Sequence, residues 1–313
     1  MPENNETVIE FKNVTKTFQN LTALNNVSFQ IKKGQFHGFI GANGAGKTTL
    51  FRSILGFYPD VKGEILINGK SWKDISFKEK IGYIPEVAMF PKKLTVLEYL
   101  EIFAGLSNIP WKEIRPKVFQ LLEHYNIASE IYNKNGNNLS SGQKKKILLI
   151  QALLNDPEIL ILDEPAANLD PKIRVELYES LKELAKKGKT IFVSSHILTE
   201  LQEYIDSFTV LDKGNVVETS TIEGKISKSN YKFTIESDEV KAIEEILKNV
   251  LKITKTKNLD KFELKENIFL IMCGQDEFDK ILLEIIKQKI PYKFAGKYIP
   301  KLNDIYFDVL KAE

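Results

Sequence analysis

Cysteine and histidine are scarce in this sequence. Its 313 residues include one cysteine, Cys273, and three histidines. A single cysteine excludes an internal disulfide and a cysteine-based metal cluster, and it suits a reducing compartment. We interpret Cys273 as a small apolar residue buried in a strand, and His37 and His124 as packing or surface residues.

Long apolar runs and an excess of one charge are also missing. The longest apolar runs, residues 147–154 and 159–162, are far shorter than the ~18 residues that a membrane-spanning helix requires. Residues 1–7 lack the basic start and apolar stretch of a signal peptide. Basic and acidic side chains number 44 and 42, a balance too even to indicate a nucleic-acid surface or a polybasic membrane anchor. We therefore expect a chain that does not cross a membrane by itself and binds no nucleic acid directly, and we interpret the lysines at 144–146 as solvent-exposed.

A glycine-rich segment after the apolar residues 36–40 predicts a nucleotide-binding site. It reads Gly41-Ala42-Asn43-Gly44-Ala45-Gly46-Lys47-Thr48-Thr49 and precedes a helical pattern. In such a P-loop, glycines let backbone N–H groups turn toward a phosphate, and the positive end of the following helix adds to the attraction. Lys47 is placed to bridge the β- and γ-phosphates, and the Thr48 hydroxyl to bind Mg²⁺. The segment predicts a nucleoside triphosphate as the ligand, with Mg²⁺ as its metal.

Two acidic residues end a second apolar strand. Residues 159–162 deliver Asp163 and Glu164 to the carboxyl edge of a sheet, where α/β proteins gather their ligands. Adjacent strand residues point to opposite sides, so the two carboxylates should differ in role. We predict that Asp163 completes the Mg²⁺ shell and that Glu164 accepts or orients the proton of the attacking water. The alternative is that both acids merely end a strand.

Three further segments, taken with these two, resemble the ATP-binding cassette (ABC) ATPases. Leu139-Ser140-Ser141-Gly142-Gln143 resembles the family signature Leu-Ser-Gly-Gly-Gln. Ala167-Asn168-Leu169-Asp170 stands in the place of the family's D-loop, and His196 follows a predicted strand at 190–194. The five elements occur in the family's order, and the resemblance covers roughly residues 5–222.

The resemblance implies that the signature of one chain contacts the γ-phosphate held by a second copy. Ser140, Gly142 and Gln143 are therefore expected to bind nucleotide across a dimer, and Asp170 is included in the same nucleotide-binding set. Ordinary helix capping is the alternative for Ser140, and the two roles are compatible.

Two aromatic positions take roles from the same resemblance. His196 is expected to act with Lys47 and Glu164 in catalysis, holding the γ-phosphate and the water in line. Phe18 occupies the position where the family stacks a ring on adenine, with a core phenylalanine as the alternative.

Two positions depart from the family pattern. Glu86 stands where most members have a glutamine that contacts Mg²⁺, and a carboxylate can still bind the metal. The predicted metal ligands are therefore Thr48, Asp163 and Glu86. Ser141 replaces a glycine and adds a Cβ, which would be costly if its φ were positive.

Strand and helix patterns divide the chain into two predicted domains. Residues 1–222 predict an ABC-type P-loop α/β domain with a mixed sheet, an antiparallel layer and a helical insertion at about 87–140. The signature helix is predicted over 144–155. Residues 223–313 show the order β-α-β-β-α-β, which predicts a small accessory α+β domain of ferredoxin-like topology.

The resemblance implies the ATP-hydrolysing subunit of an ABC transporter. We expect it to dimerise on Mg-ATP, with itself or a related nucleotide-binding subunit, and to drive separate transmembrane permease subunits from the cytoplasmic face of the membrane. Residues 302–310 resemble the closing segment of ABC-2 type exporters, which favours export. One alternative is a soluble ABC ATPase that acts on ribosomes or DNA, but the chain has a single cassette and no heptad repeats, which argues against it. The other alternative is a P-loop kinase, which would lack the signature and His196.

Overall fold

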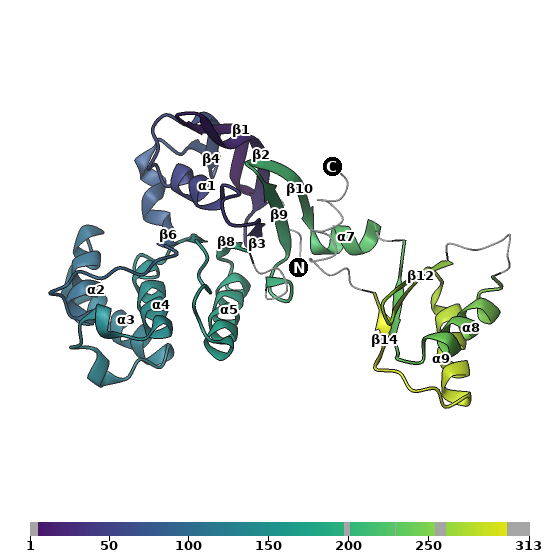
Figure 1. The fold of residues 1–313 in the computed structure, drawn as a ribbon. Coiled ribbons are helices and arrows are strands. Elements are labelled where there is room, and N and C mark those ends of the chain that lie inside the picture. Colours follow the sequence, from purple (N-terminus) through teal and green to yellow (C-terminus); the bar gives the residue numbers. More distant parts are fainter. Residues whose placement is uncertain (1–5, 197–200, 229, 254–260, 299–313) are drawn as a thin grey trace. The chain divides into compact units, whose positions relative to one another are not determined.

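The structure, a computed structural model, describes residues 6–196, 201–228, 230–253 and 261–298. They form two compact units, one ending at Thr221 and the other beginning at Ile222 (Figure 1). None of the described helices has the length and apolar character needed to span a membrane. The export-type segment predicted at 302–310 lies outside the described residues.

A mixed six-stranded sheet forms the centre of the first unit. Its strands, in sheet order, are β10 (Asn215–Thr221), β9 (Ser207–Asp212), β3 (Phe36–Ile40), β8 (Thr190–Ser195), β7 (Ile159–Leu162) and β6 (Ile81–Ile84). Neighbours pair in parallel except β10, which is antiparallel to β9. Strands β3, β7 and β8 are buried along their whole length, as central parallel strands require. The predicted mixed sheet is confirmed.

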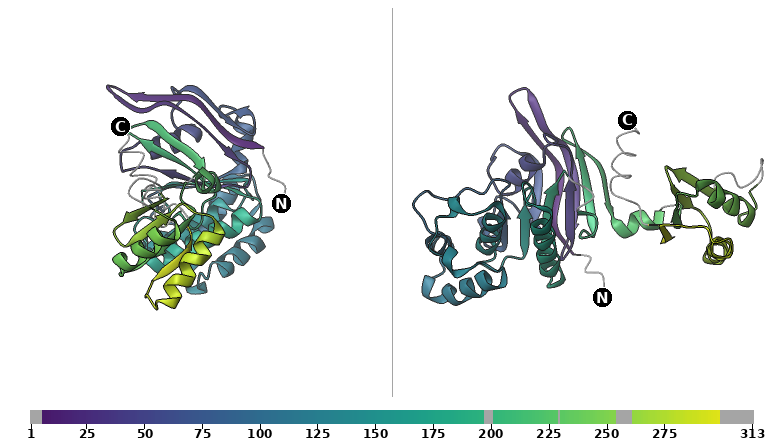
Figure 2. Two further views of the ribbon diagram at one scale, coloured as in Figure 1. Left: turned by 90° about the vertical axis from the view of Figure 1, so that its right-hand side faces the viewer. Right: turned by 60° about the horizontal axis from the view of Figure 1, so that its bottom comes forward.

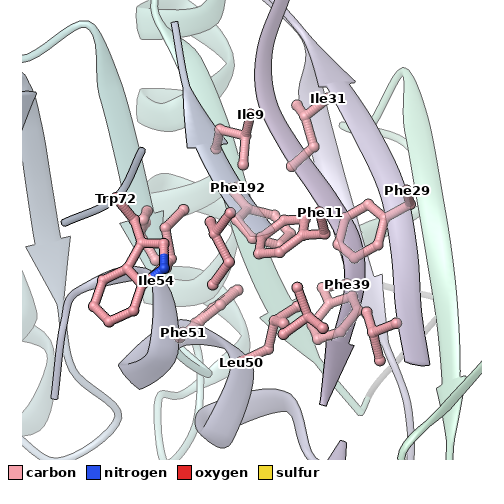
Figure 3. Packing of buried hydrophobic residues seen from close by; sticks show 14 of the residues in the cluster. Ile9, Phe11, Phe29, Ile31, Phe39, Leu50, Phe51, Ile54, Trp72 and Phe192 are labelled. Atoms are coloured by element: carbon pink, nitrogen blue, oxygen red, sulfur yellow. The ribbon is translucent and has the colours of Figure 1, made fainter. Parts of the chain in front are cut away.

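An antiparallel layer packs beside this sheet, also as predicted. Its strands, in sheet order, are β2 (Leu21–Lys32), β1 (Thr7–Phe18), β4 (Lys62–Ile67) and β5 (Lys70–Ser71), and η1 (Ile75–Lys80) follows them. Figure 3 shows the apolar core of this unit, in which Phe11 and Phe29 of the antiparallel layer meet Phe192 of β8. Phe51 of α1 (Lys47–Ile54) packs edge-on against Phe192, with ring centroids 4.6 Å apart. The helix after the P-loop is thereby anchored in the core.

Helices follow in the middle of the chain. They are α2 (Val96–Leu106), α3 (Trp111–His124), η2 (Ser129–Ile131), η3 (Gly136–Asn138), α4 (Ser141–Ala152) and α5 (Pro171–Lys186) (Figure 1). The predicted range 144–155 for the signature helix is wrong at both ends. Helix α4 begins earlier because Ser140 and Gln143 form a capping box, in which each side chain accepts a hydrogen bond from the other's backbone N–H.

Lys145 corrects the expectation that residues 144–146 are solvent-exposed. Its side chain is buried, and its ammonium donates hydrogen bonds to the carbonyl oxygens of Pro85 and Glu86. Burial lowers the pKa of Lys145 to about 8, although nearby carboxylates oppose that shift. The lysine faces inward because it shares a helix face with the buried Leu148 and Ala152.

The second unit has its own sheet and core. Its elements are α7 (Ile222–Lys228), β11 (Phe233–Glu236), α8 (Val240–Val250), β12 (Phe262–Lys265), β13 (Ile268–Ile271), α9 (Gln275–Lys287) and β14 (Phe294–Lys297). The antiparallel sheet has the order β12-β13-β11-β14, which is the strand order of a ferredoxin-like fold, and α8 and α9 lie side by side on it (Figure 2). Cys273 is half-buried just beyond β13 and packs against this core, and burial raises the pKa of its thiol to about 11.

Candidate nucleotide-binding site

The P-loop leads from β3 into α1 through a conformation that requires glycine. Gly46, the N-cap of α1, has a φ of 113°, and a Cβ there would lie 2.5 Å from the carbonyl oxygen of Ala23. Lys47 follows directly and is buried. Its ammonium donates to the carbonyl oxygens of Gly41 at 2.7 Å and Ala42 at 3.1 Å. The lysine therefore folds back over its own loop, where a bound phosphate chain would lie.

The three predicted catalytic residues converge. Glu164 Oε1 lies 3.1 Å from Lys47 Nζ, a contact that is ionic rather than a well-directed hydrogen bond. The other oxygen, Oε2, lies 2.8 Å from Nδ1 of His196. An ionised carboxylate can only accept, so Nδ1 carries the proton in this contact. Glu164 is buried, and its φ of 43° turns the chain sharply just after β7.

A serine that the sequence analysis assigned no role joins the two consecutive acids. The Ser194 hydroxyl donates to Asp163 Oδ1 at 2.8 Å and accepts from the backbone N–H of Glu164 at 2.8 Å. Ser194 and Asp163 are both fully buried. The available signal was a serine directly after the apolar residues 191–193 of the buried strand β8, because a buried hydroxyl needs a partner.

A cavity of about 800 Å³ brings most of the predicted nucleotide ligands together. The predicted residues that line it are Phe18, Asn43, Gly44, Gly46, Lys47, Thr48, Thr49, Glu86, Glu164 and His196. Residues without a predicted role also contribute, among them Thr22, Asn168 and Lys213. Gly41 and Ala45 complete the loop itself: the carbonyl of Gly41 binds Lys47, and that of Ala45 accepts from the Gly214 N–H.

Phe18 lies at the edge of this cavity and outside the core. It is 36% exposed, so the core alternative is wrong. The Lys16 ammonium lies 4.3 Å from the Phe18 ring centroid, and Tyr58 packs against the ring edge-on at 5.1 Å. Lys16 is itself paired with Asp60 at 2.6 Å. These neighbours hold the ring and leave part of it open to the cavity, which suits stacking on a nucleobase.

The predicted metal ligands share an adjoining cavity of about 660 Å³, lined by Thr48, Glu86 and Asp163 among others. A hydroxyl and two carboxylates are the hard oxygen donors that Mg²⁺ prefers. No group of three or more His, Cys, Asp or Glu side chains among the described residues could hold a metal alone. This donor set fits Mg²⁺, which is usually held by one or two carboxylates together with phosphate oxygens and water.

The signature residues and Asp170 lie outside both cavities. Ser140 is exposed at the N-terminus of α4, with Gln143 in its capping box, and Asp170 caps α5 by accepting from the Ile173 N–H. Gly142 permits close packing, since a Cβ there would lie 2.8 Å from Ile173 Cγ2. Ser141 is the first residue of α4, so its backbone is helical. Its φ is therefore not positive, and its Cβ causes no backbone strain.

His37 and His124 lie away from the catalytic group. His37 is buried in β3, with Nδ1 2.8 Å from the Ser207 hydroxyl and Nε2 3.0 Å from the Thr209 hydroxyl. Burial lowers the pKa of His37 to about 3. His124 is exposed at the end of α3. The packing and surface interpretations of these two histidines are confirmed.

Comparisons with known proteins by sequence and by structure give the same family. A family model described as ABC transporter matches residues 24–167. A putative ABC transporter ATP-binding protein of Mycoplasma pneumoniae is 42% identical over 77% of this chain and 74% of its own length. An ABC transporter ATP-binding protein of Bacillus subtilis is 34% identical over 97% of this chain and 99% of its own. A Nod factor export ATP-binding protein of Burkholderia orbicola is 34% identical over 67% of this chain and 69% of its own.

Solved structures of ATP-binding cassettes also superpose on this chain. The ATP-binding subunit of an ABC transporter superposes with a TM-score of 0.64 at 30% identity, covering 71% of this chain and 92% of that one. A dimeric ATP-binding cassette in a post-hydrolysis state, bound to ADP and Pi, superposes with a TM-score of 0.62 at 28% identity, covering 68% and 98%.

Proposed function

Because this chain belongs to the ABC transporter family, as an ATP-binding subunit that hydrolyses ATP to drive transport, we propose that two copies close head to tail around two molecules of Mg-ATP. The observation that carries the hydrolytic part of the proposal is the meeting of Lys47, Glu164 and His196 at one cavity. A cation, a general base and a hydrogen-bond donor are the groups that phosphoryl transfer to water requires.

The division of labour follows from the contacts. Lys47 offsets negative charge on the β- and γ-phosphates, while Glu164 accepts the proton of the attacking water. His196 Nδ1 orients the Glu164 carboxylate, so the base is held before the water arrives. Thr48, Asp163 and Glu86 would hold Mg²⁺, which neutralises charge on the phosphate oxygens when bound.

A second chain completes each site in this proposal. Ser140 is exposed at the N-terminus of α4 and does not line the cavity of its own chain. Free N–H groups and the dipole at a helix N-terminus attract an anion. The γ-phosphate held by the opposite copy is a suitable partner, with Gly142, Gln143 and Asp170 in the same contact zone. The related cassette bound to ADP and Pi is dimeric, which supports the arrangement.

We further propose export, through separate permease subunits at the cytoplasmic face of the membrane. One relative is a Nod factor export protein, which favours that direction. The permease would dock at the cavity of about 660 Å³ that contains Glu86, which the exposed Val87 and Met89 line together with Tyr99 and Phe103 of α2. These apolar side chains could receive the apolar face of an amphipathic helix, while Thr48, Glu86 and Asp163 line another part of the same cavity. Residues 223–313 would serve as an accessory domain beside the catalytic domain of residues 1–222 and its helical subdomain at 87–140.

The competing candidate, an ABC ATPase acting on ribosomes or DNA, is separated by one fractionation. In the transport proposal, the chain copurifies from membranes with a protein of several hydrophobic segments, and detergent extraction keeps the two together. Co-sedimentation of the chain with ribosomes, or its retention on DNA, with no membrane partner would overturn the transport proposal.

A further inference from the structure

Lys145 is a buried cation that the hydrolysis scheme above does not use. Lys145 is the fifth residue of α4, and only 4% of it is exposed. Its neighbour Lys144, by contrast, is only half-buried. Its ammonium donates to the carbonyl oxygens of Pro85 at 3.0 Å and Glu86 at 2.6 Å. Both carbonyls belong to the segment that leaves β6, so this side chain ties α4 to that segment.

The tie lies between acidic groups of the candidate site. The charges of Glu86, Asp163 and Glu164 all favour the ammonium form of Lys145. Burying a cation against two carbonyl oxygens is costly, and burial lowers the pKa of Lys145 to about 8, but these three carboxylates offset part of that cost. The link between α4 and the Glu86 segment is therefore charge-assisted and anchored in the nucleotide site.

The C-terminal end of α4 packs closely against β6 itself. A Cβ at Gly82 of β6 would lie 2.7 Å from the carbonyl oxygen of Ala152, the last residue of α4. Glycine at this position allows helix and strand to approach closely. Hydrogen bonds from Lys145 near one end of α4 and close packing on Gly82 at the other hold α4 against the segment from Gly82 to Glu86, so the two should move as one body.

We propose that Lys145 is a positioning residue that couples the Glu86 segment to the signature end of α4. Ser140 caps the same helix five positions earlier, so a shift of Glu86 toward bound nucleotide carries the signature with it. Leu148 and Gln151 of α4 line the same cavity of about 660 Å³ as Glu86. A partner bound in that cavity therefore contacts both α4 and the Glu86 segment. The inference rests on the proposed dimeric function, since the signature acts on the opposite copy.

The test uses the full chain in a Glu164→Gln background, where ATP is expected to hold the dimer. Lys145→Met removes the donors and keeps most of the stem, Lys145→Arg keeps the charge, and Lys144→Met is the matched control. We expect Lys145→Met to weaken ATP-driven dimerisation by about tenfold, while ATP affinity changes by less than about threefold. Dimerisation is followed by sedimentation and binding with a fluorescent ATP analogue. With Glu164 restored, Lys145→Met should lower kcat by about tenfold with little change in KM.

Positioning and folding roles are separated by the same set of variants. Lys145→Arg should keep dimerisation and kcat within about threefold, and Lys144→Met should match the parent. Should Lys145→Met fail to fold, Lys145→Gln, which removes the charge and carries its N–H donors on a shorter side chain, should show the same split between dimerisation and ATP affinity. Normal dimerisation and kcat in folded Lys145→Met, or in Lys145→Gln where Lys145→Met does not fold, would overturn this inference alone. A Glu164→Gln parent that stays monomeric with ATP would overturn both the inference and the proposed function.

Discussion

Glu164 combines two properties that make it the most informative residue to change. Its carboxylate is buried, and each oxygen has a different partner, Lys47 on one side and His196 on the other. An amide of the same size keeps the shape of the site but has no oxygen basic enough to take a proton from water. The base function can therefore be removed with little change in packing.

Glu164→Gln should bind ATP, accumulate as an ATP-bound dimer and hydrolyse ATP at least about 100-fold more slowly. Steady-state phosphate release and sedimentation with ATP measure the two effects. Glu158→Gln is the control, because Glu158 is a half-exposed partner of Lys80 outside the site and should leave both properties unchanged. A Glu164→Gln chain that stays monomeric with ATP and hydrolyses at the normal rate would refute the assignment of Glu164.

Ser194 carries a second prediction about a single side chain. Ser194→Ala removes the donor to Asp163 Oδ1 and the acceptor for the Glu164 N–H, so two buried groups lose a partner. We expect the free energy of unfolding to fall by about 1–3 kcal/mol and the Mg²⁺ concentration for half-maximal activity to rise. Urea unfolding and a Mg²⁺ titration measure these changes. Ser53→Ala, which removes a buried hydroxyl that donates only to the Thr49 carbonyl, should leave the Mg²⁺ titration unchanged.

At the scale of elements, β3 carries a pH-sensitive contact at its second residue, His37. His37 is buried between β3 and β9, and burial lowers its pKa from 6.5 to about 3. Between these two values the unfolded chain binds a proton that the folded chain excludes. The free energy of unfolding should therefore fall by about 1.4 kcal/mol for each pH unit below 6.5, and His37 should add no pH dependence above that value.

Urea unfolding at pH 7.5 and pH 5.5 checks the contribution of His37. The loss of stability on acidification should be smaller in His37→Gln by about 1.4 kcal/mol, because glutamine does not titrate. His124→Gln, a change at the exposed end of α3, serves as the control and should keep the parent's response. Equal responses in His37→Gln and the parent would show that His37 does not set this dependence.

Elements with a strong local signal were predictable from the sequence. The buried strands β3, β7 and β8 are short apolar runs, and the P-loop residues are contiguous, so pattern alone locates them. The start of α4 was harder to predict. Charged residues follow Gln143 and interrupt the apolar pattern, so the pattern does not reveal the capping box that determines the first residue of the helix. Its end was placed too late because the apolar run extends beyond the last helical residue.

Contacts between distant segments were the part that could not be read from local pattern. Lys145 lies on a face with Leu148 and Ala152, so its periodicity hinted at burial, but its partners Pro85 and Glu86 are about 60 residues away. Ser194 likewise contacts residues about 30 positions earlier. Side chains that position a site from other strands become visible only when the sheet is assembled.

At the scale of the whole molecule, each of the two units has its own apolar core, and the nucleotide cavity lies in the first unit. Phe11, Phe51 and Phe192 belong to one apolar cluster, and Phe233, Phe269 and Phe278 to another. The cavity is lined entirely by residues between Phe18 and Gly214. A domain with its own core can fold alone, so nucleotide chemistry should not require the second unit.

A chain ending at residue 221 should therefore fold, bind ATP within about twofold of the parent affinity and, with Glu164→Gln, still dimerise. Thermal unfolding, nucleotide titration and sedimentation give the three measurements. Its control is the full chain with Phe269→Ala, which opens the second core while leaving the first intact and should likewise keep ATP affinity. Loss of ATP binding in both would mean that the second unit supports the nucleotide site, and that the catalytic and accessory domains proposed above act as one.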